Sequence, residues 1–282
     1  MLRSRSTWTP RRPGSVCATM SEPGPAQPVD NRFGLIVVGD EILAGRRRDR
    51  HFEGIGDLLR ARGYQLHWLR ILPDEPGYLV SELRRSMAEG IPVFSCGGIG
   101  ATPDDHTRAC AAQAAGVSLA RHRGAVAEIE AQFGPDAYPR RIRMAELPQG
   151  SDLIPNPVNR IPGFSIRRHH FLPGFPDMAH PMAQWVLERD YPALRPESQK
   201  SVWVSGVTET VLMELMEDLT RRFPQQKLFS LPRLGEIPYV ELGYRGGAEI
   251  EQPFSALLEG LRAGGFSFEL RAGSRSEPAL DS

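Results

Sequence analysis

The chain has 282 residues, and its 34 Lys and Arg residues balance 34 Asp and Glu residues, so the formal net charge is zero. Hydrophobic residues make up 40% of the chain, the share of an ordinary globular protein, which excludes disorder along its whole length. A surface that grips nucleic acid usually shows a basic excess, so this balance predicts no nucleic-acid partner. No apolar run is long enough to span a bilayer, so no membrane partner is expected either.

The chain has three cysteines, which lie too far apart for a disulfide framework or a paired metal motif. A reducing, cytoplasmic compartment is the simplest expectation. Residues 1–31 are rich in Arg, Ser and Pro, and they are predicted to be a disordered extension, in which Met1 or Met20 could be the true start. Residues 273–282 are predicted to be a flexible tail. Between these ends, we expect a large domain over 32–191 and a small domain over 199–272, joined by a linker at 191–198.

The large domain alternates short buried strands with amphipathic helices, many of which end at a glycine. This order predicts an α/β fold, a mostly parallel sheet between two layers of helices. The predicted strands are 33–38, 64–72, 91–95 and 165–172, and the predicted helices are 52–62, 76–89, 104–115, 124–133, 138–147 and 177–189.

The small domain follows a different order, in which two strands stand next to each other between two helices. This strand–helix–strand–strand–helix–strand order predicts a small ferredoxin-like α+β domain. Its strands are expected at 201–207, 227–231, 239–244 and 266–270, and its helices at 209–223 and 253–263.

The first candidate site directly follows the first predicted strand, with the sequence GDEILAG over residues 39–45. Asp40 and Glu41 are flanked by Gly39 and Gly45, at a strand end where they could hold a metal ion or accept hydrogen bonds from ligand hydroxyls. The alternative is that Asp40 only begins a helix or turn and that Gly45 only permits a turn.

The second candidate site is the glycine-rich segment after the third predicted strand. Gly97, Gly98 and Gly100 let the backbone approach a ligand closely and point its N–H groups inward. A helix is expected to follow at once, and its N-terminus favours an anion, so the segment predicts a cradle for phosphate or carboxylate. A small buried side chain is the expected role of the neighbouring Cys96.

Acidic residues next to that cradle require a separate explanation. Thr102 and Asp105 fit the start of a helix, as its N-cap and its capping-box acid, so Asp105 is expected to be structural and Asp104 functional. Carboxylates beside a phosphate repel it unless a cation intervenes. Mg²⁺, or another divalent ion, resolves this conflict because it accepts carboxylate and phosphate oxygens together.

Two further loops are expected at the same edge of the sheet. Asn156, in a Pro- and Asn-rich segment, carries a donor and an acceptor that could read a heterocycle or a ribose, or it could simply stabilise a turn. Pro173 and Gly174 fix a tight turn between a strand and a helix, where a structural role is the simpler interpretation.

The four loops together, in this order and spacing, resemble the molybdopterin-binding domain superfamily and, within it, the competence/damage-inducible protein A group. This resemblance covers about residues 33–191, and the small domain resembles the middle domain of that group. It implies a three-layer, usually oligomeric fold, so a homo-oligomer is expected. Members of the molybdopterin pathway bind the pterin dithiolene phosphate and adenylylate it with Mg²⁺, and the competence-protein group is associated with hydrolysis of nucleotide pyrophosphates such as ADP-ribose.

Two departures concern the ligand. Asp49 and His51 stand where the family often has asparagines, and Ala101 stands where many relatives have proline. The carboxy-terminal amidase domain of the group is not expected in this chain.

The sequence therefore predicts a protein that binds a phosphate-containing molybdopterin or nucleotide with Mg²⁺. It is expected to be a nucleotidyltransferase, a nucleotide pyrophosphatase or, alternatively, a binding or scaffold module without turnover. Glu41 and Asp104 are the candidate catalytic residues, and Asp40, Glu41 and Asp104 are the candidate metal ligands. The ligand-binding candidates are Gly39, Asp40, Gly45, Gly97, Gly98, Gly100, Thr102, Asp105, Asn156, Pro173 and Gly174. This hypothesis requires the Gly39 and Gly98 segments to meet in space.

Overall fold

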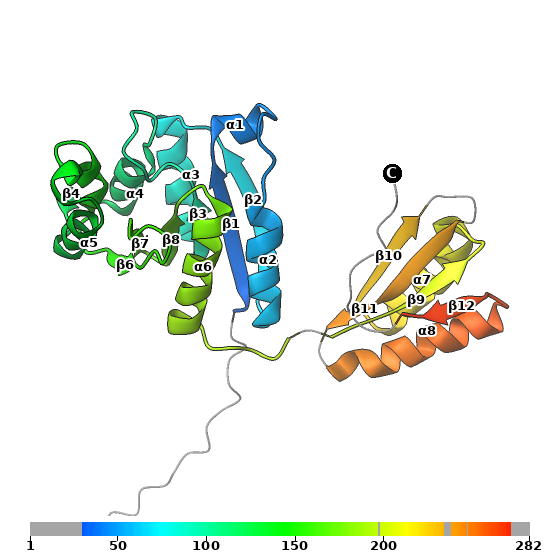
Figure 1. Cartoon of the computed structure of the whole chain (residues 1–282). Helices are drawn as coiled ribbons and strands as arrows, with labels where there is room; N and C mark the ends of the chain where they lie inside the picture. Colours follow the sequence, from blue (N-terminus) through cyan, green and yellow to red (C-terminus); the bar gives the residue numbers. More distant parts are fainter. Residues whose placement is uncertain (1–29, 197, 234–237, 247, 272–282) are drawn as a thin grey trace, which may run out of the picture. The chain divides into compact units, whose positions relative to one another are not determined.

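The computed structural model describes residues 30–196, 198–233, 238–246 and 248–271 (Figure 1). Almost all of the predicted N-terminal extension, 1–31, and the whole predicted tail, 273–282, lie outside these ranges. Within the described ranges, no helix combines the length and the apolar composition needed to cross a bilayer.

A six-stranded sheet in the order β2-β1-β3-β8-β7-β6 forms the centre of the large domain. The four strands β2, β1, β3 and β8 are parallel, while β7 and β6 add an antiparallel edge, so the predicted, mostly parallel α/β sheet is confirmed. The strands are β1 (Arg32–Val38), β2 (Gln65–Leu72), β3 (Val93–Cys96), β6 (Asp152–Ile154), β7 (Gly163–Ile166) and β8 (His169–Leu172).

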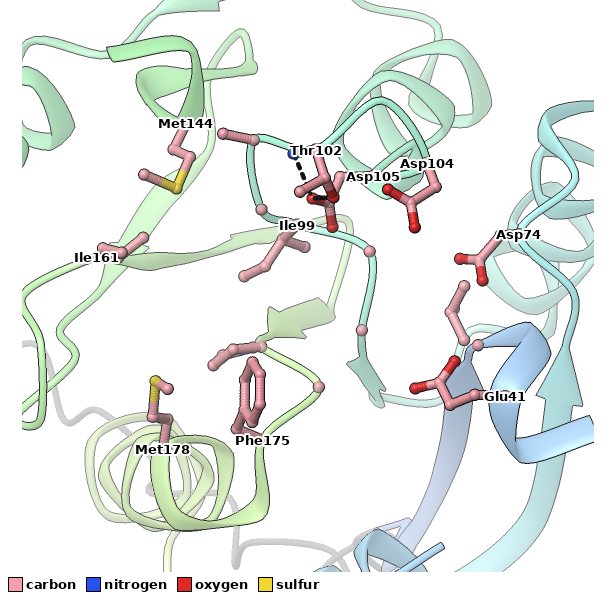
Figure 2. A pocket seen from close by; sticks show the side chains of 18 of the residues that line it. Glu41, Asp74, Ile99, Thr102, Asp104, Asp105, Met144, Ile161, Phe175 and Met178 are labelled. Atoms are coloured by element: carbon pink, nitrogen blue, oxygen red, sulfur yellow. Dashed lines mark hydrogen bonds between the residues drawn. The ribbon is translucent and has the colours of Figure 1, made fainter. Parts of the chain in front are cut away.

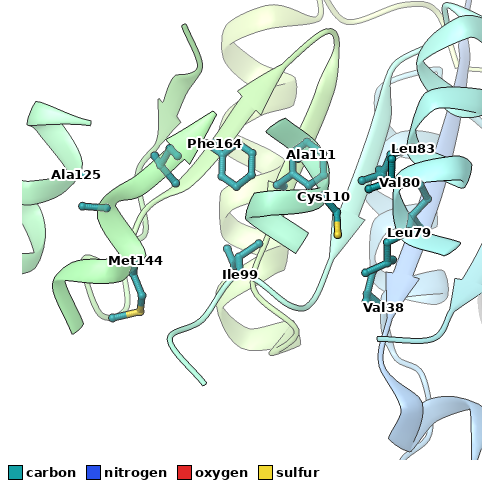
Figure 3. Packing of buried hydrophobic residues seen from close by; sticks show 14 of the residues in the cluster. Val38, Leu79, Val80, Leu83, Ile99, Cys110, Ala111, Ala125, Met144 and Phe164 are labelled. Carbon is teal, nitrogen blue, oxygen red and sulfur yellow. The ribbon is translucent and has the colours of Figure 1, made fainter. Parts of the chain in front are cut away.

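Helices cover both faces of this sheet, because the buried strand β1 presents apolar side chains in both directions. Phe33, Leu35 and Val37 pack against one layer, and Ile36 and Val38 pack against the other. Figure 3 shows part of the hydrophobic cluster on the Ile36 and Val38 side, where Val38 packs with side chains of the helices α3 (Pro76–Glu89) and α4 (Thr107–Ala115). The first layer contains α2 (His51–Ala61) and α6 (Pro176–Asp190), and the second contains α3 (Pro76–Glu89), α4 (Thr107–Ala115) and α5 (Arg123–Phe133).

Three predicted elements differ from the structure. The helix expected over 104–115 begins only at Thr107, and the helix expected over 138–147 is replaced by η2 (Arg141–Ala145) and the short strand β5 (Glu146–Pro148), after η1 (Gly134–Ala137). Strand β5 pairs with β4 (Leu119–Arg121), which was not predicted.

The third difference is that the strand expected over 165–172 is the hairpin β7–β8. Its turn residues, Arg167 and Arg168, have φ angles of 51° and 61°. Such left-handed turns usually carry Asn or Gly, so two arginines gave no turn signal.

The small domain confirms the ferredoxin-like prediction. Its antiparallel sheet has the order β10-β11-β9-β12, so the first and third strands of the domain are the inner ones. Val202, Leu242, Leu219 and Leu257 belong to its own buried cluster between the sheet and the helices. The elements are β9 (Ser198–Ser205), α7 (Glu209–Arg222), β10 (Lys227–Arg233), β11 (Tyr239–Gly246), η3 (Ala248–Ile250), α8 (Glu251–Ala263) and β12 (Phe268–Leu270).

Candidate functional site

The ends of neighbouring strands bring the predicted loops together: three of them follow the parallel strands β1, β3 and β8, and the loop with Asn156 follows the edge strand β6. The backbone N–H of Gly39 donates to the carbonyl of Leu72, at 3.1 Å, and the N–H of Gly97 donates to the carbonyl of Leu172, at 3.0 Å. A Cβ added to Gly97 would lie 2.3 Å from the carbonyl oxygen of Val38, so the glycine-rich segment touches the end of β1, where the Gly39 segment begins. The expected meeting of the Gly39 and Gly98 segments is therefore confirmed at the edge where open α/β sheets bind ligands.

A cavity of about 440 Å³ opens between these loops. Figure 2 shows that it has two unlike sides, with the carboxylates of Glu41, Asp74 and Asp104 at the right and apolar side chains at the left. The cavity is lined by Val38, Gly39, Glu41, Arg47, Asp74, Gly97, Gly98, Ile99, Gly100, Ala101, Thr102, Asp104, Asp105, Met144, Asn156, Asn159, Ile161, Pro173, Gly174, Phe175 and Met178.

The glycine-rich loop can form an anion cradle. Gly97 and Gly98 have φ angles of 113° and 67°, which favour glycine. A Cβ at Gly98 would also lie 2.3 Å from the hydroxyl oxygen of Thr107, so no side chain fits there. Within the described chain, no group accepts a hydrogen bond from the backbone N–H groups of residues 98–101. Four consecutive donors are thus left for a ligand anion.

The turn after this loop differs from the predicted helix start. Because α4 begins at Thr107, Thr102 is not its N-cap. Instead, the Asp105 carboxylate accepts hydrogen bonds from the Thr102 N–H, at 2.8 Å, and from the Thr102 hydroxyl. Asp105 therefore fixes the turn, whereas the Asp104 side chain is exposed at the cavity.

Arg108 ties the glycine-rich loop to the neighbouring segment. Its buried guanidinium donates to the carbonyls of Gly100, at 2.8 Å, and Glu146, at 3.1 Å, and also to that of Arg143. Since these carbonyls come from two chain segments, Arg108 holds the back of the loop in place. Sequence reasoning did not single it out.

Asp74 is the acidic site residue that the sequence analysis missed. It follows β2 directly and exchanges hydrogen bonds with Asp40: the Asp40 N–H donates to its carboxylate at 3.0 Å, and its own N–H donates to the Asp40 carboxylate at 3.4 Å. Burial raises the pKa of Asp74, and the charges of Asp40, Glu41 and Asp104 raise it further. Its position after a parallel strand, in the sequence Leu72-Pro73-Asp74, is the signal that could have found it.

Eleven of the predicted site residues line the cavity, and two do not. Asp40 is bonded to Asp74 beside the cavity instead of lining it. Gly45, with a φ of 68°, ends the turn after α1 (Asp40–Leu43), where an added Cβ would meet nothing. In the described part of the chain, no three His, Cys, Asp or Glu side chains are arranged so that they could hold a metal ion by themselves.

The opposite side of the cavity is apolar and suits a flat ring. Ile99, Met144 and Ile161 approach it from three separate segments, and Phe175 and Met178 approach it from the start of α6 (Figure 2). Two sulfur atoms and an aromatic ring make this side polarizable, which favours contact with a π-system.

Asn156 is largely occupied within its own loop. Its side-chain oxygen accepts from the N–H groups of Val158, at 3.0 Å, and Asn159, at 3.4 Å, and its amide nitrogen donates to the sulfur of Met178, at 3.7 Å. The predicted ligand-reading amide thus also shapes the loop that lines the cavity.

Arg47 is the one cationic side chain among the described residues that line the cavity. Its guanidinium lies 3.6 Å from the Glu41 carboxylate and 5.6 Å from the centre of the Phe175 ring. It therefore stands between the acidic and the apolar sides.

Asp49 and His51, which depart from the resembling family, have structural roles, whereas Ala101, the other departure, lines the cavity. The Asp49 carboxylate accepts from the N–H groups of His51, at 2.9 Å, and Phe52, at 3.0 Å, and so caps the start of α2. Burial lowers the pKa of His51, which favours the neutral ring. Nε2 of His51 lies 3.3 Å from the Gly174 carbonyl, so with its proton on that nitrogen the ring supports the Pro173–Gly174 turn.

Comparisons with known proteins agree with this architecture. Residues 34–195 match the family described as probable molybdopterin binding domain. A protein of Pyrobaculum arsenaticum is 27% identical over 237 residues, which cover 80% of this chain and 89% of that protein. A CinA-like protein of Citrifermentans bemidjiense is 28% identical over 80% of this chain but only 59% of its own length.

Among solved structures, the protein CinA from Thermoplasma acidophilum, described as having unknown function, is similar with a TM-score of 0.53 and 30% identity. The match covers 57% of this chain and 98% of that one. With its mostly parallel sheet, its glycine-rich segment after β3 and these matches, the chain belongs to the molybdopterin-binding domain family and is CinA-like.

Proposed function

We propose that the cavity binds a phosphate-containing pterin or nucleotide. One observation supports this proposal. A single cavity at the carboxyl edge of the sheet has, on one side, four backbone N–H groups without an acceptor among the described residues and, on the other, an apolar wall. The backbone N–H groups of residues 98–101 would receive the phosphate, and Phe175 and Met178 would contact the ring. A volume of about 440 Å³ suits a ligand of this size.

A divalent cation, Mg²⁺ or a similar hard ion, would join the phosphate to the acidic side. Without a cation, Glu41, Asp74 and Asp104 would repel a phosphate. Mg²⁺ usually takes only one or two protein carboxylates together with phosphate oxygens, so these residues fit an ion that arrives with its ligand and do not form a site that holds it alone. When bound, the ion would neutralise phosphate charge and polarise a P–O bond.

The residues of the chain suit chemistry at a phosphoanhydride. The N–H groups of the glycine-rich loop would stabilise the negative charge that develops on phosphoryl oxygens. Glu41 or Asp104 would accept the proton of the attacking group. In hydrolysis, the attacking water would lose this proton, its oxygen would bond to one phosphorus, and the P–O bond of the anhydride would break with the second phosphate group as the leaving group. In adenylyl transfer, an oxygen of a second ligand would bond to the α-phosphorus of ATP and pyrophosphate would leave; a phosphate oxygen as the attacking group needs no base.

The test combines mass spectrometry of co-purified ligands with thermal shift and turnover. The ligands tested are ADP-ribose, FAD and ATP with a pterin, with and without Mg²⁺. The expected result is a Mg²⁺-dependent rise in melting temperature, with product formation that Asp104→Asn abolishes. A ligand-dependent rise in melting temperature without product formation would show that the domain binds its ligand but does not turn it over. No rise with any of these ligands would refute the proposal.

A further inference from the structure

The small domain leaves one face of its sheet outside its hydrophobic core. Val202, Val204 and Leu242 pack against α7 and α8. The alternate side chains of the four strands point the other way, and the strand register aligns Leu231, Glu241, Trp203 and Glu269 across this side. We name it the open face, centred on Trp203 and Glu241.

Aromatic side chains lie in the middle of the open face. Trp203 on β9 and Tyr239 on β11 have ring centres 5.6 Å apart, and both strands are the inner ones of the sheet. Phe229 on β10 lies on the same side. All three rings are half-buried, and none belongs to a hydrophobic cluster of the described chain. These rings therefore do not serve the core of the domain.

The open face is also rich in positive charge. Among the described residues of this face, the basic ones are Lys227, Arg233, Arg245 and Arg271, and the acids are Glu241 and Glu269. Arg233 and Arg245 already interact with other groups of the chain, so the exposed Lys227 is the basic residue that the variants below test. The carboxylate of Glu241 is satisfied within the face, because Ser201 donates to it at 2.7 Å and Arg271 at 2.6 Å. The Arg271 guanidinium also lies 5.7 Å from the Trp203 ring centre.

We propose that the open face binds single-stranded nucleic acid. Bases would stack on Trp203 and Tyr239, and the basic side chains would hold the phosphates. A four-stranded sheet that stacks two or three bases on aromatic side chains is a common platform for single-stranded RNA. Stacking of this kind tolerates many sequences because every base has a flat face.

Two features of the face favour this partner. A duplex hides the flat faces of its bases, so it offers the rings nothing to stack on, and the charge of the face complements a phosphate backbone. The net charge of the whole chain is zero, and this value led to the expectation of no nucleic-acid partner. It averages over the chain and so hides the local excess of positive charge on the open face. The inference concerns another domain and does not depend on the proposed ligand cavity.

The test measures fluorescence anisotropy of labelled oligo(U) and oligo(dT), about 12 nucleotides long, with the full chain. Binding of both single strands is expected at about 50 mM salt, with clear weakening at about 200 mM. A duplex of the same length is expected to bind far more weakly. Failure to bind any single strand at the lower salt, or equal binding of the duplex, would overturn the proposal and leave the face to a protein partner.

Variants locate the binding on the open face. Trp203→Ala and Tyr239→Ala are each expected to weaken binding by about 5-fold to 100-fold. Tyr78→Ala, which removes an exposed ring from the large domain, is the matched control and is expected to change nothing. Circular dichroism checks that the aromatic variants fold. If they do not, Lys227→Gln still tests the face, because Lys227 is exposed and the loss of one phosphate contact lowers the slope of log binding constant against log salt concentration by about one. Unchanged binding in folded aromatic variants, or an unchanged slope in Lys227→Gln, would contradict the proposal.

Discussion

At the scale of single residues, the charge of the cavity depends on Arg47. Arg47 stands among four acidic residues that line the cavity. Its ion pair with Glu41 joins two half-exposed side chains, so little free energy is lost when Arg47 leaves Glu41 to contact a ligand anion. Arg47→Ala is expected to weaken binding of an anionic ligand by about 10-fold to 100-fold, the usual value of a hydrogen bond to a charged group. Titration calorimetry with ADP-ribose measures this change.

The matched control for Arg47 is its neighbour Arg46. Arg46 is exposed and does not line the cavity, so Arg46→Ala is expected to leave the affinity unchanged. Equal losses in both variants would mean that only long-range charge matters. If the unchanged protein binds ADP-ribose and Arg47→Ala binds it equally well, the role assigned to Arg47 is wrong while the proposed function stands.

Asp74 gives a pH-dependent prediction. Because burial and three nearby carboxylates raise its pKa, the folded protein holds this proton more tightly than the unfolded chain. The free energy of unfolding therefore falls as the pH rises through the titration of Asp74. Asp74→Asn keeps an oxygen that accepts from the Asp40 N–H but carries no charge, so it is expected to be more stable than the natural protein at neutral pH.

Urea unfolding across a pH series tests this prediction. The difference in unfolding midpoint between Asp74→Asn and the natural protein should disappear at low pH, where the aspartic acid is neutral as well. A constant difference at every pH would show that the charge of Asp74 is not the cause. Glu75→Gln, next in the chain and outside the cavity lining, is the control.

The residues of the site could be predicted where local sequence determines their geometry. The glycines at 97 and 98 and the acids Glu41 and Asp104 follow strands whose apolar runs are plain in the sequence. Asp74 could not be predicted from local sequence, because its place in the site depends on the pairing of β2 with β1, which brings it next to Asp40. The path of the backbone after α1 also lay beyond the sequence, which is why Gly45 was expected at a cavity that it does not line.

At the scale of elements, long amphipathic helices and buried strands were predictable, whereas short segments were not. The start of α4 was misplaced because Thr102 and Asp105 bond to each other in a turn instead of capping the helix. The strand 165–172 was expected to be continuous because its apolar pattern runs through Arg167 and Arg168 without a turn signal. In both cases a local turn decided the outcome, and the residues that form it did not mark it as a turn in the sequence.

The hairpin β7–β8 can therefore be stabilised at its turn. Arg167 has a φ of 51°, a left-handed conformation that Asn adopts more readily than Arg. Arg167→Asn is expected to raise the free energy of unfolding by about 0.5–1 kcal/mol, measured by urea denaturation. Arg168→Asn is the contrasting variant, because Arg168 also donates to the Gly90 carbonyl at 2.7 Å, a bond that Asn would lose. Destabilisation by Arg167→Asn would contradict the turn assignment.

Strand β8 makes the large domain sensitive to acid. It buries His169, whose Nε2 lies 2.7 Å from the Ser86 hydroxyl, and His170, whose Nδ1 lies 2.8 Å from the Ser165 hydroxyl. Burial lowers the pKa of His169 to about 4 and that of His170 to about 3. The unfolded chain, with histidine pKa values near 6.5, therefore binds protons first as the pH falls.

The resulting stability is complete above about pH 6.5 and is lost progressively toward the two folded pKa values. The loss amounts to about 3 kcal/mol for His169 and about 5 kcal/mol for His170, since each unit of pKa difference corresponds to about 1.4 kcal/mol. His169→Gln is expected to reduce the slope of unfolding free energy against pH, between about pH 6.5 and 5, by the contribution of one histidine, at most about 1.4 kcal/mol per pH unit. An unchanged slope would mean that other groups cause the acid sensitivity.

At the scale of the whole molecule, the hydrophobic clusters predict two cooperative units. Leu212, Leu242 and Leu257 belong to a cluster confined to the small domain, whereas the clusters of the large domain involve only residues 33–194. Calorimetry is therefore expected to show two unfolding transitions. Leu242→Ala, which opens a cavity in the small core, should lower one transition by about 2–5 kcal/mol of stability and leave the other unchanged.

Ligands then assign each transition to its domain, because a molecule that binds a folded domain stabilises only the unit that contains its site. A nucleotide with Mg²⁺ should raise the transition that Leu242→Ala leaves unchanged, and a single-stranded oligonucleotide should raise the one that it lowers. At a ligand concentration about 100 times the dissociation constant, each shift corresponds to about 2.7 kcal/mol. A single transition that moves with both ligands would show that the two cores unfold together. If the nucleotide instead raised the transition of the small domain, the nucleotide site would lie in that domain and its assignment to the large-domain cavity would be wrong.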